Sequence, residues 1–273
     1  MTPAAGEVLA LDRVGVEWPG AAPGAPSYVA VEEVSLSVRR GEFLSVVGPT
    51  GCGKTTLLNV AAGLLPPTSG AVLAFGERLS GLNRRAGYLF QADALMPWRN
   101  ARENVEAGLV FAGVDRGEVV RRADDWLRRV GLAGFGDRYP HQLSGGMRKR
   151  VALAQVLILE PEILLMDEPF AALDVQTRQL MENELLELWS AERRSVVFIT
   201  HDLEEAISLS DRIVLLSAGP RTRPLGEFTI DLPRPRDVAE IRLTPRFLEL
   251  HGRIWAALRA EVLKAYAVSQ RLG

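Results

Sequence analysis

The sequence has little of what marks secreted, membrane-spanning or nucleic-acid-binding proteins. Cys52 is the single cysteine in 273 residues, so no internal disulfide can form, which fits a reducing compartment. No apolar run approaches the ~20 residues that cross a bilayer, and residues 1–6 show no secretory signal pattern. Lys and Arg number 32 against 34 Asp and Glu, without the basic excess of a dedicated nucleic-acid binder. We therefore expect a cytoplasmic protein that binds no nucleic acid.

The composition is otherwise that of an ordinary globular protein, with 47% apolar and 24% charged residues. The first third has the pattern of β structure. Residues 7–18 and 28–38 are predicted strands, joined by a Pro/Gly/Ala-rich loop at 19–27 that indicates an exposed hairpin connection. Further strands are predicted at 42–47, 71–75 and 86–90, and a helix at 54–65.

The pattern becomes helical over residues 100–159, where apolar side chains recur at spacings of three and four. Short apolar strands then alternate with a helix at 175–190, which indicates a parallel α/β sheet. These strands are predicted at 163–166, 195–199 and 212–217. Residues 245–269 form one amphipathic helix whose apolar stripe is Phe247, Leu250, Ile254, Leu258 and Val262. That helix either docks on its own core or faces a partner.

A phosphate-binding loop is the strongest motif. Residues 48–55 match G-x-x-x-x-G-K-[ST] between a predicted strand and a helix, and read Gly48, Pro49, Thr50, Gly51, Cys52, Gly53, Lys54 and Thr55. Glycines let backbone N–H groups curl around phosphates, and the helix dipole favours the anion. Lys54 is expected to reach the β- and γ-phosphates, and Thr55 to ligate Mg²⁺. The same N–H dipoles predict a thiolate at Cys52.

A second acidic element follows the strand at 163–166, where Asp167 and Glu168 stand at its carboxyl end. Asp167 is expected to hold Mg²⁺, and Glu168 to orient or deprotonate an attacking water. Together with the phosphate loop, this pair predicts a nucleoside triphosphatase.

A third motif distinguishes among such proteins. Leu143-Ser144-Gly145-Gly146-Met147 opens a predicted helix, with Ser144 as its N-cap. With the two preceding motifs, it makes the chain resemble the ATPase subunits of ABC transporters over nearly its whole length. In that family, Ser144, Gly145 and Gly146 would bind the γ-phosphate of ATP held by a second copy, using the N–H groups at the helix N-terminus.

The resemblance implies further site residues. Gln91 would contact Mg²⁺ and water, Asp174 would lie at the dimer interface beside the hydrolytic site, and His201 would contact the γ-phosphate. Thr56 completes the expected ATP-binding set. Trp18 would stack on adenine, with Tyr28 as the competing choice because the 19–27 loop blurs the alignment. The chain departs from many members in having Met147 and Lys149 where glutamines are common, which leaves the Ser144 and glycine contacts intact.

The resemblance also implies an architecture. A P-loop NTPase (RecA-like) α/β core with an N-terminal antiparallel β part would occupy about residues 1–91 and 160–220. A helical subdomain would fill about 92–159, and a C-terminal strand and amphipathic helix about 221–273, all within one ABC ATPase domain.

The direction of transport is suggested by Leu95, Met96, Pro97 and Trp98. These residues either pin their loop to the domain or line a groove that accepts a membrane permease. Together with residues 166–170 and 246–250, their sequence resembles the nitrate, sulfonate and taurine importer branch. This implies an ATP- and Mg²⁺-dependent homodimer at the cytoplasmic face of the inner membrane, bound to a permease and served indirectly by a solute-binding protein. A soluble ABC ATPase of an assembly or repair machine is the alternative.

Overall fold

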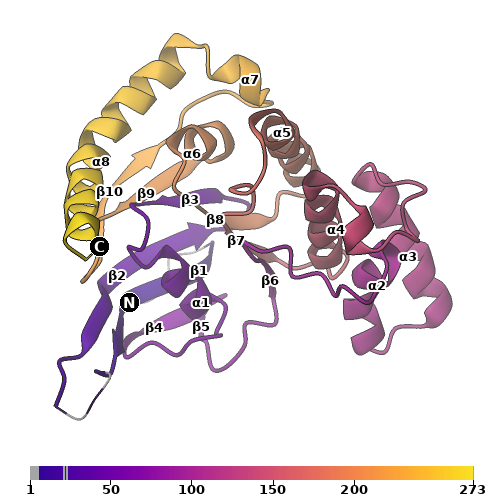
Figure 1. The fold of residues 1–273 in the computed structure, drawn as a ribbon, viewed down its shortest axis with the longest axis horizontal. Helices are drawn as coiled ribbons and strands as arrows, with labels where there is room; N and C mark the ends of the chain where they lie inside the picture. The colour runs from indigo at the N-terminus through magenta and orange to yellow at the C-terminus, as the bar shows by residue number, and fades with distance from the viewer. Residues whose placement is uncertain (1–5, 21, 23, 273) are drawn as a thin grey trace.

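The computed structural model describes residues 6–20, 22 and 24–272, with side chains up to Ala267. The expectation that no secretory signal opens the chain rests on residues 1–6, most of which lie outside the described part. The molecule consists of two sheets, one helix enclosed between them, further helices on the opposite face of the second sheet and a laterally attached group of helices (Figure 1).

The N-terminal sheet is antiparallel, with the order β2-β1-β4-β5. The predicted hairpin is confirmed, because β1 (Glu7–Trp18) pairs with β2 (Tyr28–Arg39) and brings Trp18 opposite Tyr28. β4 (Ser69–Ala74) and the two-residue β5 (Glu77–Arg78) complete the sheet.

The second sheet has six strands in the order β10-β9-β3-β8-β7-β6. The strands β3 (Phe43–Val47), β6 (Ala86–Leu89), β7 (Ile163–Asp167), β8 (Ser195–Thr200) and β9 (Arg212–Leu216) run parallel, and β10 (Pro224–Thr229) is antiparallel at the edge. Every residue of β3, β7 and β8 is buried, as in a parallel sheet covered on both faces. The predicted α/β fold class with an antiparallel N-terminal part is confirmed.

Helices cover both faces of this sheet. α1 (Lys54–Ala61) lies between the two sheets and contacts β1, β2, β7 and β8. It stops short of the predicted residue 65 because Gly63 has φ +71° and two prolines follow at 66 and 67. α5 (Val175–Glu192), α6 (Leu203–Leu209) and α7 (Val238–Ile241) lie on the other side with α8 (Pro245–Leu272).

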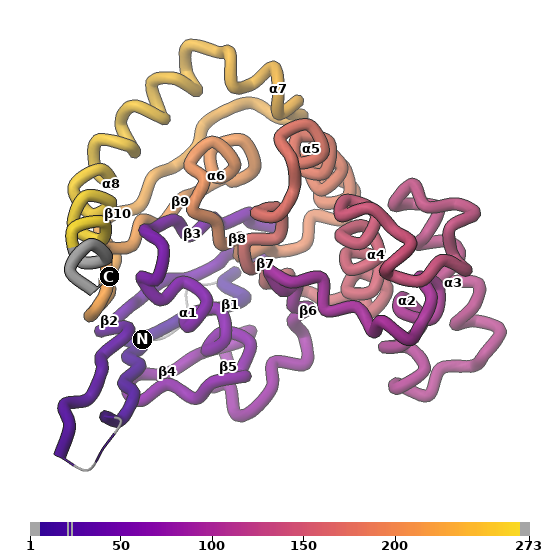
Figure 2. Tube along the Cα trace, viewed as in Figure 1, coloured from indigo at the N-terminus to yellow at the C-terminus, as the bar shows by residue number. Residues whose placement is uncertain are grey.

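α8 docks on the core of its own chain, which confirms the first of the two alternatives for the amphipathic tail. Phe247, Leu250, Ile254 and Leu258 are buried in a cluster with side chains of α6, β9 and β10. The tube in Figure 2 shows α8 running from the neighbourhood of α7 back toward β10 and the N-terminal hairpin.

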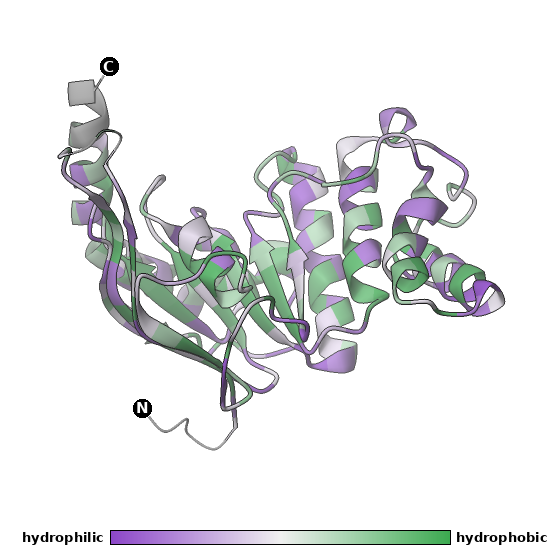
Figure 3. Cartoon of the chain, turned by 90° about the horizontal axis from the view of Figure 1, so that it is seen from below, coloured by the Kyte–Doolittle hydropathy of each residue, from purple (hydrophilic) through white to green (hydrophobic). Residues whose placement is uncertain are grey.

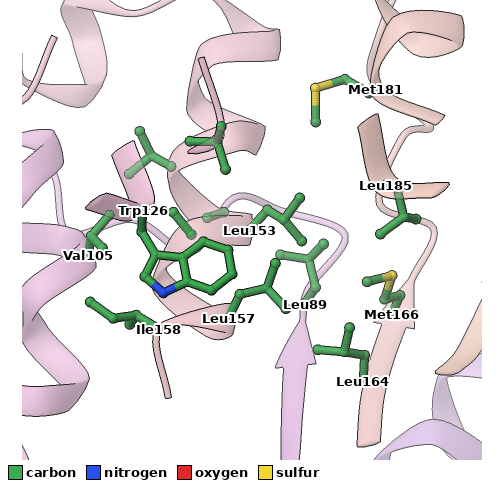
Figure 4. Close-up of a cluster of buried hydrophobic side chains, with 14 of the residues drawn as sticks. Leu89, Val105, Trp126, Leu153, Leu157, Ile158, Leu164, Met166, Met181 and Leu185 are labelled. Atoms are coloured by element: carbon green, nitrogen blue, oxygen red, sulfur yellow. The ribbon is translucent and has the colours of Figure 1, made fainter. Parts of the chain in front are cut away.

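The predicted helical region holds α2 (Ala101–Phe111), α3 (Arg116–Arg129), a short 3₁₀ helix (Pro140–Gln142) and α4 (Gly145–Leu157). Asn100, Asp115 and Ser144 cap the three α-helices with side-chain oxygens. Trp126, Leu153 and Leu157 pack toward Leu89 and Met166 of the sheet, as Figure 4 shows. One continuous core therefore joins the helices to β6 and β7.

Apolar residues concentrate in the strands and on the inner helix faces, and polar residues face outward (Figure 3). Within the described part of the chain, every helix is too short or too polar to cross a membrane.

Candidate functional site

The loop at 48–53 connects β3 to α1 and exposes backbone groups at the N-terminus of α1. Gly53, the N-cap, has φ +95°, and an added Cβ would lie 3.1 Å from the Cγ2 atom of Val31. Gly51 has φ +76° and is exposed. These left-handed conformations explain why glycine is needed at both positions. Thr50 and Thr55 are exposed, and Thr56, in the first turn of α1, is half-buried. Gly48 and Pro49, where the loop leaves β3, are buried.

Lys54 lies folded against this loop. Its Nζ donates hydrogen bonds to the carbonyl oxygens of Gly48 (2.9 Å) and Pro49 (3.1 Å). The same nitrogen is 3.7 Å from Oε1 of Glu168, and the side chain is only 5% exposed. The ammonium group of Lys54 therefore lies between the loop at 48–53 and the acidic pair Asp167 and Glu168 at the end of β7.

Asp167 lies against the first turn of α1. The hydroxyl of Thr55 donates to Oδ1 of Asp167 (3.1 Å), and the hydroxyl of Tyr88 is 3.5 Å from Oδ2. Burial raises the pKa of Asp167, while the bond from Thr55 opposes the shift. A hydroxyl and a carboxylate are oxygen donors of the kind Mg²⁺ accepts.

The described residues contain no cluster of three or more His, Cys, Asp or Glu able to hold a metal ion. In proteins, Mg²⁺ is commonly bound through one or two carboxylates together with substrate phosphates and water.

Glu168 and His201 meet at the carboxyl ends of neighbouring strands. Glu168 follows β7 and His201 follows β8, and Nδ1 of His201 is 2.9 Å from Oε2 of Glu168. Glu168 has φ +42°, a strained conformation for a non-glycine residue, and its N–H is anchored to the carbonyl of Ile199 (2.9 Å). Strain of about 1–3 kcal/mol persists only where the surroundings enforce it, often at functional sites.

A second group of predicted residues gathers where α4 and α5 begin. An added Cβ on Gly146 would lie 2.7 Å from Cγ2 of Thr177, so the Gly145-Gly146 turn packs closely on α5. Ser144 accepts the Met147 N–H (3.2 Å), which confirms its role as N-cap, and Asp174 caps α5 through the Thr177 N–H (3.0 Å). Figure 1 shows α4 beyond β6 and β7 as seen from α1. The predicted residues thus lie in two separate groups within one chain.

Gln91 lies between these groups, with an exposed side chain. Its backbone carbonyl accepts a hydrogen bond from Nζ of Lys149 (2.7 Å), which is also 3.1 Å from Oδ1 of Asp93. Lys149 is 3% exposed. In the sequence this lysine is a departure from the family pattern that leaves the Ser144 and glycine contacts intact, and in the structure it ties α4 to the loop that carries Gln91.

The expected thiolate at Cys52 is wrong. The side chain is 2% exposed, and burial raises its pKa more strongly than the nearby Lys54 lowers it. The backbone of residue 52 curls around the loop, but its sulfur points into the core, where the charged form is disfavoured.

The three predicted aromatic contacts are all exposed. Trp18 and Tyr28 face each other across the end of the hairpin and are 43% and 50% exposed, so neither is a core residue. Trp98 is 73% exposed, which excludes the anchoring alternative for it. Asn104, fully buried, shapes the Trp98 loop by accepting the Met96 N–H (2.7 Å) and donating to the carbonyls of Met96, Arg99 and Asn100.

A cleft of about 820 Å³ lies between the loop at 48–53, His201 and α8. Trp255, Leu258 and Tyr266 line its α8 side together with His251, which stacks on Phe247. Neither role expected for this helix, docking on its own core or facing a partner, includes the position beside the site that the structure shows. Leu258 belongs to the buried stripe, whereas Trp255 and Tyr266 flank it, and apolar periodicity alone does not show that any of them borders a cleft.

A family model described as "ABC transporter" matches residues 31–171. The chain belongs to the ABC transporter ATP-binding family. It is 48% identical over 237 residues to an uncharacterized ABC transporter ATP-binding protein of Methanocaldococcus jannaschii, covering 86% of each chain. It is 46% identical over 191 residues to the taurine import ATP-binding protein TauB of Escherichia coli, covering 70% of this chain and 75% of that protein. The nitrate import ATP-binding protein NrtC of Synechococcus elongatus is 39% identical over 85% of this chain and 36% of its own length.

Solved structures agree with the fold of this ABC ATPase. A dimeric ATP-binding cassette in a post-hydrolysis state, bound to ADP and Pi, superposes with a TM-score of 0.72 at 32% identity, covering 82% of this chain and all of that one. This protein is therefore the ATP-binding subunit of an ABC transporter, as its sequence predicted.

Proposed function

We propose that this ABC transporter ATPase energises import of a small anionic solute, of the nitrate, sulfonate or taurine type, through a separate membrane permease. The convergence of Lys54, Thr55, Asp167, Glu168 and His201 at the carboxyl edge of β3, β7 and β8 carries the ATPase part. The similarity to TauB and NrtC supports the importer part.

The phosphate loop binds the triphosphate in this proposal. Backbone N–H groups of residues 48–56, including Cys52 but not Pro49, which has none, surround the phosphates. Lys54 turns from its loop carbonyls to the β- and γ-phosphates. Thr55, Asp167 and Gln91 would hold Mg²⁺, which neutralises developing phosphate charge when bound. Trp18 stacks on adenine, and Tyr28 opposite it is the alternative.

Glu168 orients and deprotonates the attacking water. His201 holds the Glu168 carboxylate at 2.9 Å and stands where it can contact the γ-phosphate. The strained backbone of Glu168 fixes the carboxylate in place before the substrate arrives.

The hydrolytic site is shared between two copies of the chain. The phosphate loop and the Ser144-Gly145-Gly146 turn lie in separate parts of one chain, so each copy supplies half of two sites. In the dimer, Ser144 and the helix N-terminus at Gly145 and Gly146 bind the γ-phosphate held by the partner, beside Asp174. The dimeric relative bound to ADP and Pi supports this arrangement.

The loop at residues 95–98, which exposes Trp98, passes the motion to the permease. Asn104 holds this loop in one shape, so Trp98 is presented to a partner at little entropic cost. The protein would lie at the cytoplasmic face of the inner membrane without entering it, and a solute-binding protein would act on the permease rather than on this chain.

Membrane association tests the proposal against a soluble assembly or repair ATPase. The tagged protein, purified from membranes of its own host in mild detergent, should retain a multi-spanning permease and hydrolyse MgATP. Lys54→Ala should abolish hydrolysis and preserve the complex. Recovery only with soluble partners, or with nucleic acid, would refute the transporter assignment.

A further inference from the structure

Arg178 connects the loop before α5 with the loop after β8. It lies four residues beyond Asp174, and its Nη2 donates to the carbonyl of Leu173 (3.1 Å). Its Nη1 is 3.4 Å from Oδ2 of Asp202, and its Nε is 3.7 Å from Oε1 of Glu205. One guanidinium therefore bridges the residue preceding Asp174 and two carboxylates that follow His201.

The loop that carries His201 is closed by its own hydrogen bonds. Thr200 donates to Oε2 of Glu205 (2.6 Å) and accepts the N–H of Asp202 (2.9 Å). Asp202 in turn caps α6 by accepting the N–H groups of Glu204 (2.8 Å) and Glu205. Because His201 lies between Thr200 and Asp202, any movement of the two carboxylates carries the histidine with it.

The contacts of Arg178 in this state are incomplete. Its Nε is buried and has no hydrogen-bond acceptor. Buried polar groups without partners are rare and costly in native proteins. A shift of α5 by about 1 Å toward Glu205 would bring both long contacts within range of charge-assisted hydrogen bonds.

We propose that Arg178 is a positioning residue that couples the Asp174 loop to His201. When the partner copy contacts Asp174, the start of α5 shifts, Arg178 completes its bonds to Asp202 and Glu205, and His201 takes its hydrolytic position. ATP binding at Lys54 does not involve Arg178. This inference rests on the proposed role of His201 and on the shared site.

The test compares Arg178→Gln with Arg178→Lys, and uses Arg122→Gln as a matched control. Arg122 is exposed to nearly the same degree, 24% against 25%, and also bonds a backbone carbonyl and a carboxylate, those of Ile158 and Glu160, but it lies on α3. Arg178→Gln should lower kcat by roughly tenfold to 10²-fold, the scale of a misplaced catalytic group. The Kd for ATP, measured by titration, should stay within about twofold, because no residue of the phosphate loop is altered. Arg178→Lys should recover part of kcat, and Arg122→Gln should resemble the wild type.

Combining variants separates positioning from folding. In a His201→Ala background, Arg178→Gln should cause no further loss of turnover, because both changes remove the same contribution. A lower melting temperature of Arg178→Gln with a normal kcat per folded molecule would overturn the inference. Additive losses of turnover in the double variant would overturn it as well. Normal turnover in His201→Ala alone would refute the proposed role of His201 itself. If His201→Ala is inactive but Arg178→Gln is fully active, only the proposed coupling between the Asp174 loop and His201 is refuted.

Discussion

Replacing Trp98 with alanine should separate transport from ATP hydrolysis. The side chain is 73% exposed on a loop that Asn104 holds in shape, and it contributes no ligand to the phosphate loop. Removing it therefore deletes surface that only a partner can bury, and leaves the fold and the hydrolytic residues unchanged.

The expected loss follows from the area that a partner could cover. An indole buries roughly 200 Å². Three quarters of that, at about 25 cal/mol per Å², corresponds to roughly 4 kcal/mol. Ordering and desolvation at the interface offset part of this, leaving about 2–3 kcal/mol, a hot-spot contribution. Permease binding should weaken by roughly 30- to 150-fold.

Three measurements on the same preparations check this reasoning: affinity for the detergent-solubilised permease, isolated ATPase rate and melting temperature. Leu243→Ala is the control, because Leu243 is 82% exposed and follows α7 by two residues in the chain. Figure 1 shows α7 far from α2. Trp98→Ala should change only permease affinity and transport. If it leaves permease affinity within about twofold, which is below ~0.4 kcal/mol, the loop at residues 95–98 is not the docking surface.

Other residues give further predictions. Glu168→Gln should keep ATP binding, lower turnover by about 10²-fold or more, and leave an ATP-trapped dimer in size-exclusion chromatography; normal turnover would exclude Glu168 as the base. Cys52 should react slowly with maleimide with or without ATP, since burial raises its pKa; fast labelling of the folded protein would contradict the structure. Burial raises the pKa of Glu182 to about 8 from 4.5, outweighing Arg242. Between those pH values the native state holds a proton that the unfolded state has lost, so this group makes the free energy of unfolding fall as pH rises. Glu182→Gln should flatten that slope in denaturant titrations from pH 5 to 8, and an unchanged slope would refute the shift.

The sequence was most informative where structure is local. Hairpin β1–β2 followed from alternation and turn composition, and the phosphate loop from its glycines between a strand and a helix. The start of α1 at Lys54 was predicted correctly, but its end was not, because Gly63 reverses the chain after only eight helical residues. The seven-residue α6 is too short to show periodicity, and the pairing of β10 with β9 is a long-range choice.

Within the site, residue types were easier to predict than their contacts. Glu168 contacts His201 because β7 and β8 are neighbours in the sheet. The order of the strands in the sheet could not be predicted from the sequence. The role of Lys149 could not be predicted, because its partners are two backbone carbonyls and the carboxylate of Asp93 in a loop that is distant in the sequence. The expected thiolate at Cys52 is wrong because burial of the side chain, which the sequence does not show, outweighs the N–H dipoles.

Mixing two inactive variants tests most directly whether the site is shared between two copies. Lys54→Ala removes the phosphate-loop half and Ser144→Arg blocks the other half, so each variant alone should be inactive. In a mixed dimer one site has both halves intact. An equimolar mixture should therefore recover about a quarter of the wild-type rate, since about half of the dimers are mixed and one of their two sites works. A mixture as inactive as either variant, although size-exclusion chromatography shows mixed dimers, would contradict the shared site.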